Sequence, residues 1–486
     1  MQSIWAKDYH QWYCPQVKQN LETPILIIGG GLAGLMCAYE LMQDKKDFIL
    51  VEARELIHGV TANTTAQISL AHDTLYEDIK KSHGEKTAQA YLINQINGLK
   101  RIKEIIAAEK IACHYHEEST ILGANETKNI DVLNETLALI KPFGKIKKLT
   151  KTEGPLPFST VLEFSEQAII HPLKYLNGII KILKRHKINL YENSQVTAIH
   201  KQDYGYSVII NEQYKIKTRM IIMACHYPFL LQNCYFAKMY QSTSYAIAFK
   251  TKVKIPANYV SLDKPYYYLR TYDRNTLIIG GSDHFTGTSI NIKRCYDNLR
   301  GKIHTIDPHA VILSEWFTED CMPLNYLPYV GPYSRYHQKI ILVTGFQKWG
   351  FTNAHSAALQ VCKMIGNTQY VQNNLALFKN IPGYLRMTAH SINGLIISKI
   401  LLKSAKTIDL KIDEGKALRY QGMNVLVYLA KKNEYYIFKN KCTHMGCSLI
   451  WNNIDKVWIS KCHGTVYNKY GQIIYGPGIK NLERLN

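Results

Sequence analysis

The residues best suited to chemistry stand near the end of the chain, in two short loops that contain cysteine and histidine. The first loop, 442–447, reads Cys-Thr-His-Met-Gly-Cys, and the second, 460–465, reads Ser-Lys-Cys-His-Gly-Thr. Thiolates and imidazoles are the side chains that bind zinc, iron and iron–sulfur clusters. The loops therefore predict a metal centre close to the C-terminus, with Cys442, His444 and His463 as candidate ligands.

The spacing of these ligands resembles that of a Rieske domain. There, two thiolates bind one iron of a 2Fe-2S cluster and two imidazoles bind the other, as C-x-H from one loop and C-x-x-H from a second. Counting back from His463, the fourth ligand is expected at 460, where the chain has Ser460. A serine hydroxyl is a poor substitute for a soft thiolate because it is not anionic near neutral pH. The resemblance also implies a disulfide between Cys447 and Cys462.

Three arrangements of this tail stay open. In the first, a cluster binds with Ser460 or another group as its fourth ligand. In the second, a rearranged cluster uses Cys462 as a ligand. In the third, the tail keeps a Rieske fold without a cluster. Ligand number and softness favour loss or instability of the cluster. A further alternative is a zinc ion bound by Cys442, His444, Cys462 and His463. The adjacent positions of Cys462 and His463 make the geometry of this site unfavourable.

A second motif predicts a nucleotide site near the N-terminus. A β-branched run leads into a G-x-G-x-x-G turn formed by Gly29, Gly31 and Gly34, and a helical pattern follows directly. The glycines permit a tight turn and let the backbone approach a pyrophosphate at the positive end of the helix. A second strand, 48–51, ends at Glu52, whose carboxylate can accept hydrogen bonds from a ribose. Together these features predict a dinucleotide-binding domain.

Over nearly its whole length the chain resembles the glycine oxidase and D-amino acid oxidase superfamily of FAD-dependent oxidoreductases, in particular bacterial members that end in a Rieske domain. The resemblance rests on the small, hydroxyl-rich run 59–66 and on the motifs at 171–175, 224–228, 280–284, 327–331 and 345–353. It implies an α/β fold with an additional β domain. An FAD-binding Rossmann-like domain interleaved with an antiparallel substrate sheet would occupy 1–385, with the sheet mainly within 86–165 and 236–300. A linker helix over 386–412 and a small all-β Rieske-like domain over 413–486 would follow.

The same resemblance implies which residues hold FAD. Besides the three glycines and Glu52, these are Arg54, Thr64, Thr65, Val196, Gly345, Trp349, Gly350 and Thr352. Lys348, in the strand-to-helix turn, would stabilise the negative charge that reduced flavin acquires. Cys321 stands in a stretch comparable to the one where monomeric sarcosine oxidases attach FAD covalently. A buried, unreactive thiol is the favoured interpretation of Cys321.

Candidate substrate contacts come from the predicted antiparallel sheet. Arg270, on an aromatic strand, would clamp a substrate carboxylate, because a guanidinium binds a carboxylate through two parallel hydrogen bonds. An arginine paired with a local acid is the alternative. His72 and Tyr76 are candidates for the same cavity, with structural roles as the alternative. No catalytic protein base is required, because the cofactor carries the chemistry.

The predicted function is therefore that of an enzyme. It would be an FAD-dependent amine or amino acid oxidase or dehydrogenase that acts on a small amine or amino-acid-like substrate and passes electrons to an unknown acceptor, with a Rieske-type centre as one route. One alternative is a flavin oxidoreductase whose cluster-free Rieske-like tail is a docking module. Another is an FAD-binding assembly protein without turnover.

Composition excludes several other classes. The net charge is +21, but the lysines are scattered along the chain, which argues against a nucleic-acid-binding stripe. Eleven dispersed cysteines and an N-terminus without a basic start and apolar run favour the cytoplasm. For the apolar segment 391–405, which carries Lys399 and Lys403, a position on a membrane surface is the alternative interpretation. Packing onto the flavin domain is favoured, so membrane association is not expected.

Overall fold

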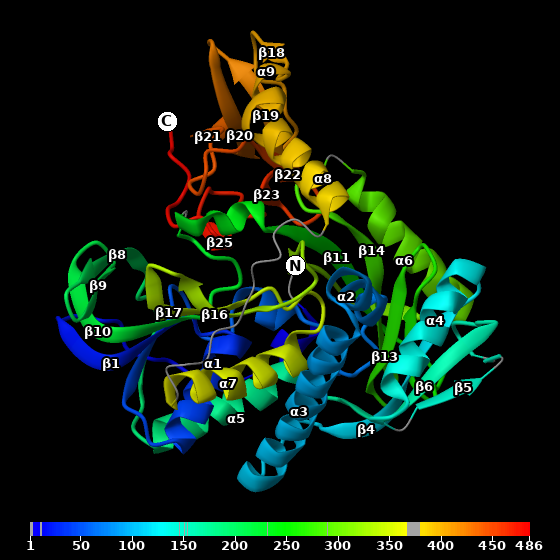
Figure 1. Cartoon of the computed structure of the whole chain (residues 1–486). Coiled ribbons are helices and arrows are strands. Elements are labelled where there is room, and N and C mark those ends of the chain that lie inside the picture. Colours follow the sequence, from blue (N-terminus) through cyan, green and yellow to red (C-terminus); the bar gives the residue numbers. More distant parts are fainter. Residues whose placement is uncertain are drawn as a thin grey trace.

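Two large sheets that alternate along the chain and a small all-β tail make up the protein (Figure 1). The computed structural model describes residues 3–9, 12–144, 146–149, 151–152, 154–230, 232–288, 290–366 and 380–486. This arrangement confirms the predicted fold class: an α/β part interleaved with a largely antiparallel sheet, followed by a separate β domain.

The first sheet has the strand order β16-β17-β10-β1-β2-β7, and the hairpin β8-β9 extends from β10. Its strands are β1 (Leu21–Ile28), β2 (Phe48–Val51), β7 (Asn189–Tyr191), β8 (Val196–Gln202), β9 (Gly205–Ile210), β10 (Tyr214–Met223), β16 (Tyr329–Ser334) and β17 (His337–Thr344). The helices α1 (Leu32–Gln43), α5 (Pro172–Arg185) and α7 (Gly350–Gly366) cover one face (Figure 1). Strand alternation explains the packing, because Ile25 and Ile27 of β1 face these helices while Leu26 faces the opposite core.

The second sheet has the order β15-β11-β14-β13-β12-β4-β6-β3, with β5 beside β6. Its strands are β3 (Gln67–Ile68), β4 (His116–Ala124), β5 (Ile146–Leu149), β6 (Thr160–Ile169), β11 (Met239–Lys250), β12 (Asn258–Ser261), β13 (Tyr267–Asp273), β14 (Thr276–Phe285) and β15 (Val311–Pro323). Its accompanying helices are α2 (Leu75–His83), α3 (Glu85–Glu109), α4 (Thr127–Ile140) and α6 (Ile292–Ile306). The short 3-10 helices are η1 (Ile4–Asp8), η2 (Gly59–Asn63) and η3 (Gln232–Ala237). Most neighbouring strands are antiparallel, as predicted for the substrate sheet.

The tail consists of two four-stranded sheets. The first contains β18 (Ser404–Ala405), β19 (Glu414–Tyr420), β20 (Met423–Lys431) and β21 (Glu434–Lys439), and the second contains β22 (Leu449–Asn452), β23 (Val457–Ser460), β24 (Val466–Asn468) and β25 (Ile473–Tyr475). Strands β20 and β21 form a hairpin across 431–434, in agreement with the all-β tail that the sequence predicts.

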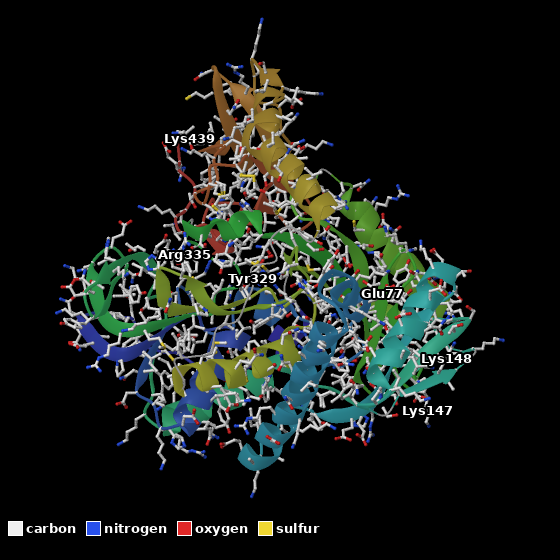
Figure 2. The ribbon with its side chains drawn as sticks, viewed as in Figure 1. Glu77, Lys147, Lys148, Tyr329, Arg335 and Lys439 are labelled. Carbon is white, nitrogen blue, oxygen red and sulfur yellow. A yellow bond between two sulfur atoms is a disulfide. The ribbon has the colours of Figure 1, made fainter. Side chains whose placement is uncertain are left out.

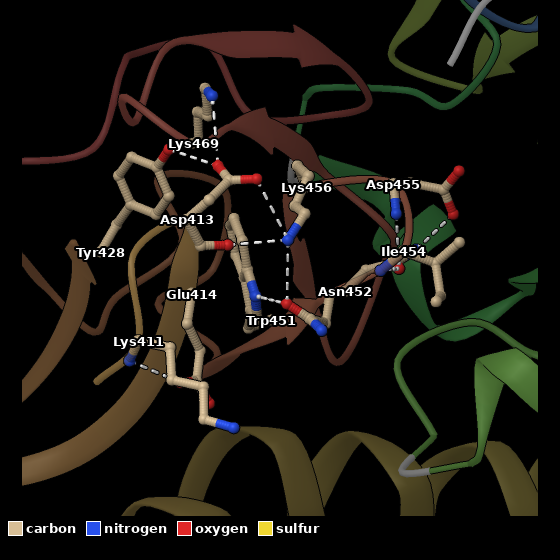
Figure 3. A network of polar contacts seen from close by, with 11 residues as sticks. Lys411, Asp413, Glu414, Tyr428, Trp451, Asn452, Ile454, Asp455, Lys456 and Lys469 are labelled. Carbon is tan, nitrogen blue, oxygen red and sulfur yellow. Dashed lines mark hydrogen bonds and ion pairs between the residues drawn. The ribbon is translucent and has the colours of Figure 1, made fainter. Parts of the chain in front are cut away.

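Asp413 joins the two sheets of the tail (Figure 3). Its carboxylate accepts a 2.7 Å hydrogen bond from the Tyr428 hydroxyl and pairs with the ammonium groups of Lys456 and Lys469 at 3.2 and 3.3 Å. The Tyr428 hydrogen bond, followed by the two lysines, lowers the pKa of the Asp413 carboxyl to about 2. Asp413 is therefore charged at any physiological pH.

A helical connection leads into the tail. It contains α8 (Ile381–Ile392), a π-helical turn (Asn393–Ile397) and α9 (Ser398–Ile400), which together occupy much of the predicted linker. The domain boundaries at 385 and 412 stay predictions. Within the part of the chain that the structure describes, no helix is long and apolar enough to cross a membrane.

Basic side chains are spread over the molecule. Lys147 and Lys148 lie at one edge of the second sheet, Arg335 lies beside the first sheet and Lys439 lies on the tail (Figure 2). All four are exposed. This distribution agrees with a general compositional bias rather than a single binding stripe, so the absence of a nucleic-acid partner stays a prediction.

Candidate functional site

A cavity of about 580 Å³ lies where the two large sheets meet the tail. The glycine turn after β1 and the ends of β2, β10 and β17 form one side, and strands β11 to β15 form another. Residues 474–479 of the tail complete the wall, and the Gln195 side-chain amide donates a 2.7 Å hydrogen bond to the Ile479 carbonyl there. The predicted FAD site and the predicted substrate sheet therefore share one cavity.

The glycine turn has the close approaches that its sequence predicts. Gly29 has a φ of 112°, and a Cβ added at Gly34 would lie 1.8 Å from the Gly29 carbonyl oxygen. The Glu52 carboxylate accepts hydrogen bonds from the main-chain N–H groups of Gly30 and Arg54, at 2.7 and 2.9 Å. Each carboxylate oxygen keeps a further lone pair for a ribose hydroxyl.

Most of the other predicted FAD contacts also line the cavity. These are Gly31, Arg54, Thr64, Thr65, Val196, Gly345, Trp349 and Gly350. The buried Nε of Arg54 has no hydrogen-bond partner within the described structure, and burial lowers the pKa of this side chain. A buried guanidinium with an unused donor fits an anionic group such as a pyrophosphate. The cavity and its residues therefore fit FAD.

Two of the predicted residues lie behind the cavity wall. The imidazole of His72 is fully buried, bonds Tyr91 and the Ser69 carbonyl, and stacks on Trp349 with ring centroids 4.4 Å apart. Burial lowers the pKa of His72 to about 3, so this ring is neutral. The Thr352 hydroxyl lies 3.5 Å from His72 Nε2. Neither side chain lines the cavity. His72 supports Trp349 from behind, and Thr352 lies against His72.

Arg270 also lies outside the cavity lining. Its guanidinium is 1% exposed and donates to the main-chain carbonyls of Thr65, Ala66 and Thr271 at 2.6 to 2.8 Å. Burial lowers the pKa of Arg270 to about 9. The structural alternative describes this arginine better than the carboxylate clamp, because main-chain carbonyls accept its hydrogen bonds and the Glu118 carboxylate is its main electrostatic partner.

Lys348 lines the cavity on the side of the second sheet. The sequence did not reveal which residues surround its ammonium group. Its ammonium forms an ion pair with Asp283 and lies 6.0 Å from the centre of the Tyr266 ring. Burial alone would lower the pKa of Lys348, but Asp283 and then Asp73 raise it above its ordinary value. Lys348 is therefore a permanent cation within a group of carboxylates.

Two of those carboxylates have unusual acidity. Burial raises the pKa of Asp73 to about 6 and that of Asp320 to about 7, against the opposing effect of Lys348. Asp73 has a φ of 46°, a conformation that non-glycine residues rarely adopt. The only sequence signals for these acids were the position of Asp283 in a family motif and that of Asp320 beside Cys321. Three tyrosines, Tyr240, Tyr266 and Tyr268, line the same region.

Cys321 also lines the cavity. Its thiol is 2% exposed, and burial raises its pKa to about 12. The neutral thiol is the poorly reactive form. Covalent attachment of FAD at this position has no support from the surroundings of Cys321.

The tail brings the predicted imidazole ligands together. The rings of His444 and His463 lie 5.1 Å apart and both pack against Tyr227 of the flavin part. Both nitrogens of His444 and Nε2 of His463 are buried, with no hydrogen-bond partner in the part of the chain that the structure describes. Burial lowers the pKa of these imidazoles to about 4 and about 3, so both are neutral and able to bind a metal.

The thiolate half of the predicted centre is incomplete. Cys442 is buried and lies 3.6 Å from the Tyr467 hydroxyl, and the expected fourth position holds the buried Ser460. Cys447 and Cys462 form the implied disulfide, which removes Cys462 as a substitute ligand. The same disulfide contradicts the zinc alternative, which requires the Cys462 thiolate as a ligand. Among the described residues no three His, Cys, Asp or Glu side chains converge on a common metal position. The donors present are one thiolate short of a Rieske cluster and do not fit it.

Comparison with known proteins agrees with this architecture. The family model described as FAD dependent oxidoreductase (DAO) matches residues 24–364, and the model described as Rieske [2Fe-2S] domain matches residues 401–486. YhfW of Bacillus subtilis (strain 168), provisionally named a Rieske 2Fe-2S iron-sulfur protein, is 28% identical, over 97% of this chain and 95% of its own length. Gamma-glutamylputrescine oxidoreductase of Escherichia coli (strain K12) is 21% identical, over 76% of this chain and 88% of its own length.

Solved structures share the fold of the flavin part. Glycine oxidase from Geobacillus kaustophilus superposes with a TM-score of 0.61 at 15% identity, over 74% of this chain and 99% of that chain. L-amino acid deaminase from Proteus vulgaris superposes with a TM-score of 0.61 at 10% identity, over 75% of this chain and 99% of that chain. The family match covers more than half of the chain, and the cavity fits the cofactor that defines the family. This chain therefore belongs to the FAD dependent oxidoreductase family and is an FAD-dependent enzyme with a Rieske domain at its C-terminal end.

Proposed function

We propose that this enzyme oxidises a small cationic amine, bound at the end of the cavity formed by the second sheet. The observation that carries the proposal is the group of acids around Lys348. Asp73, Asp283 and Asp320 all line this region, and the one ammonium among them balances a single carboxylate. The remaining negative charge favours a cation, because a charge-assisted hydrogen bond to a carboxylate is about twice as strong as a neutral one.

The tyrosines support the same class of substrate. Tyr240, Tyr266 and Tyr268 line this part of the cavity. Aromatic faces attract ammonium groups, and their apolar bodies can pack on the methylene groups of an alkyl amine.

An amine fits better than an amino acid at this position. A substrate carboxylate needs a free cation, but Lys348 is paired with Asp283 and Arg270 is held by main-chain carbonyls. Among the relatives, the Escherichia coli oxidoreductase is named for an amine, gamma-glutamylputrescine, which supports this choice.

The acids also supply a way to deprotonate the substrate. Bound FAD would accept a hydride from the carbon next to the amine nitrogen, which requires the neutral amine. A carboxylate oxygen of Asp320 can accept a proton from the substrate ammonium near neutral pH, because its pKa is about 7. Asp73, with a pKa of about 6, stays mostly charged and holds the cation in place.

Anaerobic titration of the purified flavoprotein with an aliphatic diamine tests the proposal, with flavin absorbance as the signal. Asp73→Asn should weaken amine binding by about tenfold, the loss of one charge-assisted hydrogen bond. Asp297→Asn, which removes an acid from the exposed surface of α6, is the matched control and should leave binding unchanged. An Asp73 variant that binds the diamine as tightly as the parent would contradict the proposal.

For the tail we propose a cluster-free Rieske fold that completes the cavity wall. Ser460 at the fourth ligand position and the engagement of Cys462 in a disulfide favour this version over an electron relay. Assays of iron and acid-labile sulfide on anaerobically purified protein test it, and near-stoichiometric iron and sulfide would reject it.

A further inference from the structure

The helical connection between the flavin part and the tail lies on the outside of the molecule, where α8 runs from the large sheets up along the tail (Figure 1). Together α8, the π-helical turn and α9 form about five turns of helix over 381–400. One side of this helix packs onto the protein, and the other side is free among the described residues.

The inward side is held by specific contacts. The Ser448 main-chain N–H donates to the Gly394 carbonyl at 2.9 Å, and His390 Nε2 lies 3.0 Å from the Thr286 carbonyl. A Cβ added at Gly394 would lie 2.6 Å from Cys462 Sγ, so the helix touches the disulfide-bonded loop at this turn. Met387 is 4% exposed on the same side. The orientation of the helix is therefore fixed by the protein beneath it.

The outward side is apolar, which is the reverse of an ordinary surface helix. Six large aliphatic side chains are 41 to 73% exposed: Leu385, Ile392, Ile396, Ile397, Ile400 and Leu401. We call this set the apolar ridge. Spacings of three and four residues place most of these side chains on one face, with the exposed Ala389 between the first two. Contiguous apolar surface of this kind marks a docking site.

Charge distinguishes the possible occupants. Residues 381–408 contain no Asp or Glu but include Arg386, Lys399, Lys403 and Lys406. Lys403 and Lys406 follow directly after the ridge and are exposed. An apolar helix face next to basic residues is the pattern of helices that lie in the interface of a membrane with anionic lipids. A second copy of this chain is disfavoured, because a symmetric contact would bring two basic segments together.

We propose that the apolar ridge docks this enzyme on the surface of a membrane that contains anionic lipid, with the helix lying parallel to the bilayer. The ridge enters the boundary between headgroups and acyl chains, and Lys403 and Lys406 contact the lipid phosphates. The inward contacts keep the tail attached, so docking holds the whole enzyme at the surface without any spanning segment. This proposal is independent of the substrate class.

Flotation of the FAD-loaded full chain with vesicles tests the inference. The parent protein should float with phosphatidylcholine vesicles that contain phosphatidylglycerol, and less with pure phosphatidylcholine. Ile396→Gln with Ile400→Gln should lower the partition coefficient by about tenfold or more, because both apolar side chains leave the interface. Lys403→Gln with Lys406→Gln should lower binding to the anionic vesicles alone and reduce its dependence on salt.

The matched control is Val311→Gln with Ile290→Gln, which replaces two exposed aliphatic residues far from the helix in sequence. This variant should float like the parent. Flavin content monitors folding in every variant, because none of the changed residues lines the cavity. Absence of flotation on anionic vesicles, or equal flotation of the ridge variant, would overturn the proposal. A dimer seen by light scattering and lost only in the ridge variant would assign the ridge to a second copy instead.

Discussion

The Gln195 side-chain amide donates a 2.7 Å hydrogen bond to the main-chain carbonyl of Ile479, which ties the beginning of β8 to the last loop of the tail. Nearby, a Cβ added at Gly59 would lie 3.4 Å from the Tyr475 Cβ, and Lys480 pairs with Glu212 at 2.6 Å. Both Gln195 and Ile479 line the cavity. The tail is thus part of the cavity wall and not a separate appendage.

Gln195→Ala should therefore weaken FAD binding by about fivefold, which corresponds to the loss of one neutral hydrogen bond of about 1 kcal/mol. Quenching of flavin fluorescence on titration of the apoprotein measures the change. Gln202→Ala, at the exposed far end of β8, is the control and should bind FAD normally. Equal affinity of the Gln195 variant and the parent would mean that the tail does not support the cofactor.

Arg270→Lys should destabilise the fold by about 2–3 kcal/mol without a selective effect on substrate. The guanidinium supplies several hydrogen bonds to buried carbonyls, and a lysine cannot reach them all. Thermal unfolding of the FAD-loaded protein measures the loss. Arg274→Lys, on the exposed turn after β13, serves as the control. A normal melting temperature combined with a raised KM for carboxylate-bearing substrates would restore the clamp role for Arg270.

If the tail is free of a cluster as proposed, Ser460→Cys should allow it to bind one. The change completes the pattern of two thiolates and two imidazoles, since His444 and His463 are already neutral and, among the described residues, each has a ring nitrogen without a hydrogen-bond partner. Low-temperature EPR of the dithionite-reduced protein should show a rhombic signal only in the variant. Ser448→Cys, at a buried serine outside the ligand pattern, should stay silent. A rhombic signal from the natural chain at near-stoichiometric iron would show that Ser460 is tolerated.

The rate of flavin reduction by an amine should rise as the pH increases through about 7. Burial raises the pKa of Asp320 to about 7, so the carboxylate that accepts the substrate proton is lost below that pH. Stopped-flow absorbance across a pH series measures the profile. In the Asp320→Asn variant this rise of the rate with pH should disappear, and the rate should fall by about 10²-fold, the usual contribution of a positioned base. The same rise of the rate with pH in the variant would assign the pH dependence to another group.

Local patterns predicted the nucleotide-binding elements well. The strand expected at 48–51 coincides with β2, and Glu52 follows it at the glycine turn. These features depend on neighbours in sequence, where strand alternation and turn chemistry act directly. The ligand spacing of the tail and its Cys447–Cys462 disulfide were also predicted, because both depend on two short loops close together in sequence.

Long-range pairing explains what the sequence could not reveal. The acids around Lys348 come from three distant segments that meet only through the register of the second sheet and the position of α2. The side chain of Arg270 was assigned to a substrate because no local pattern shows that it reaches the carbonyls of Thr65 and Ala66. The contribution of 474–479 to the cavity depends on docking of the whole tail, which is likewise invisible in sequence.

In the proposed reaction an amine binds in this cavity as a cation, loses a proton to Asp320, and would then be oxidised by bound FAD as the neutral amine. The most direct measurement mixes the oxidised holoprotein anaerobically with an aliphatic diamine, with its fully N-acetylated derivative and with an amino acid of similar size, and follows flavin absorbance. Bleaching by the diamine, with weaker bleaching by the amino acid and none by the acetylated compound, is the predicted result. No bleaching by any amine, or bleaching by the amino acid alone, would contradict the account.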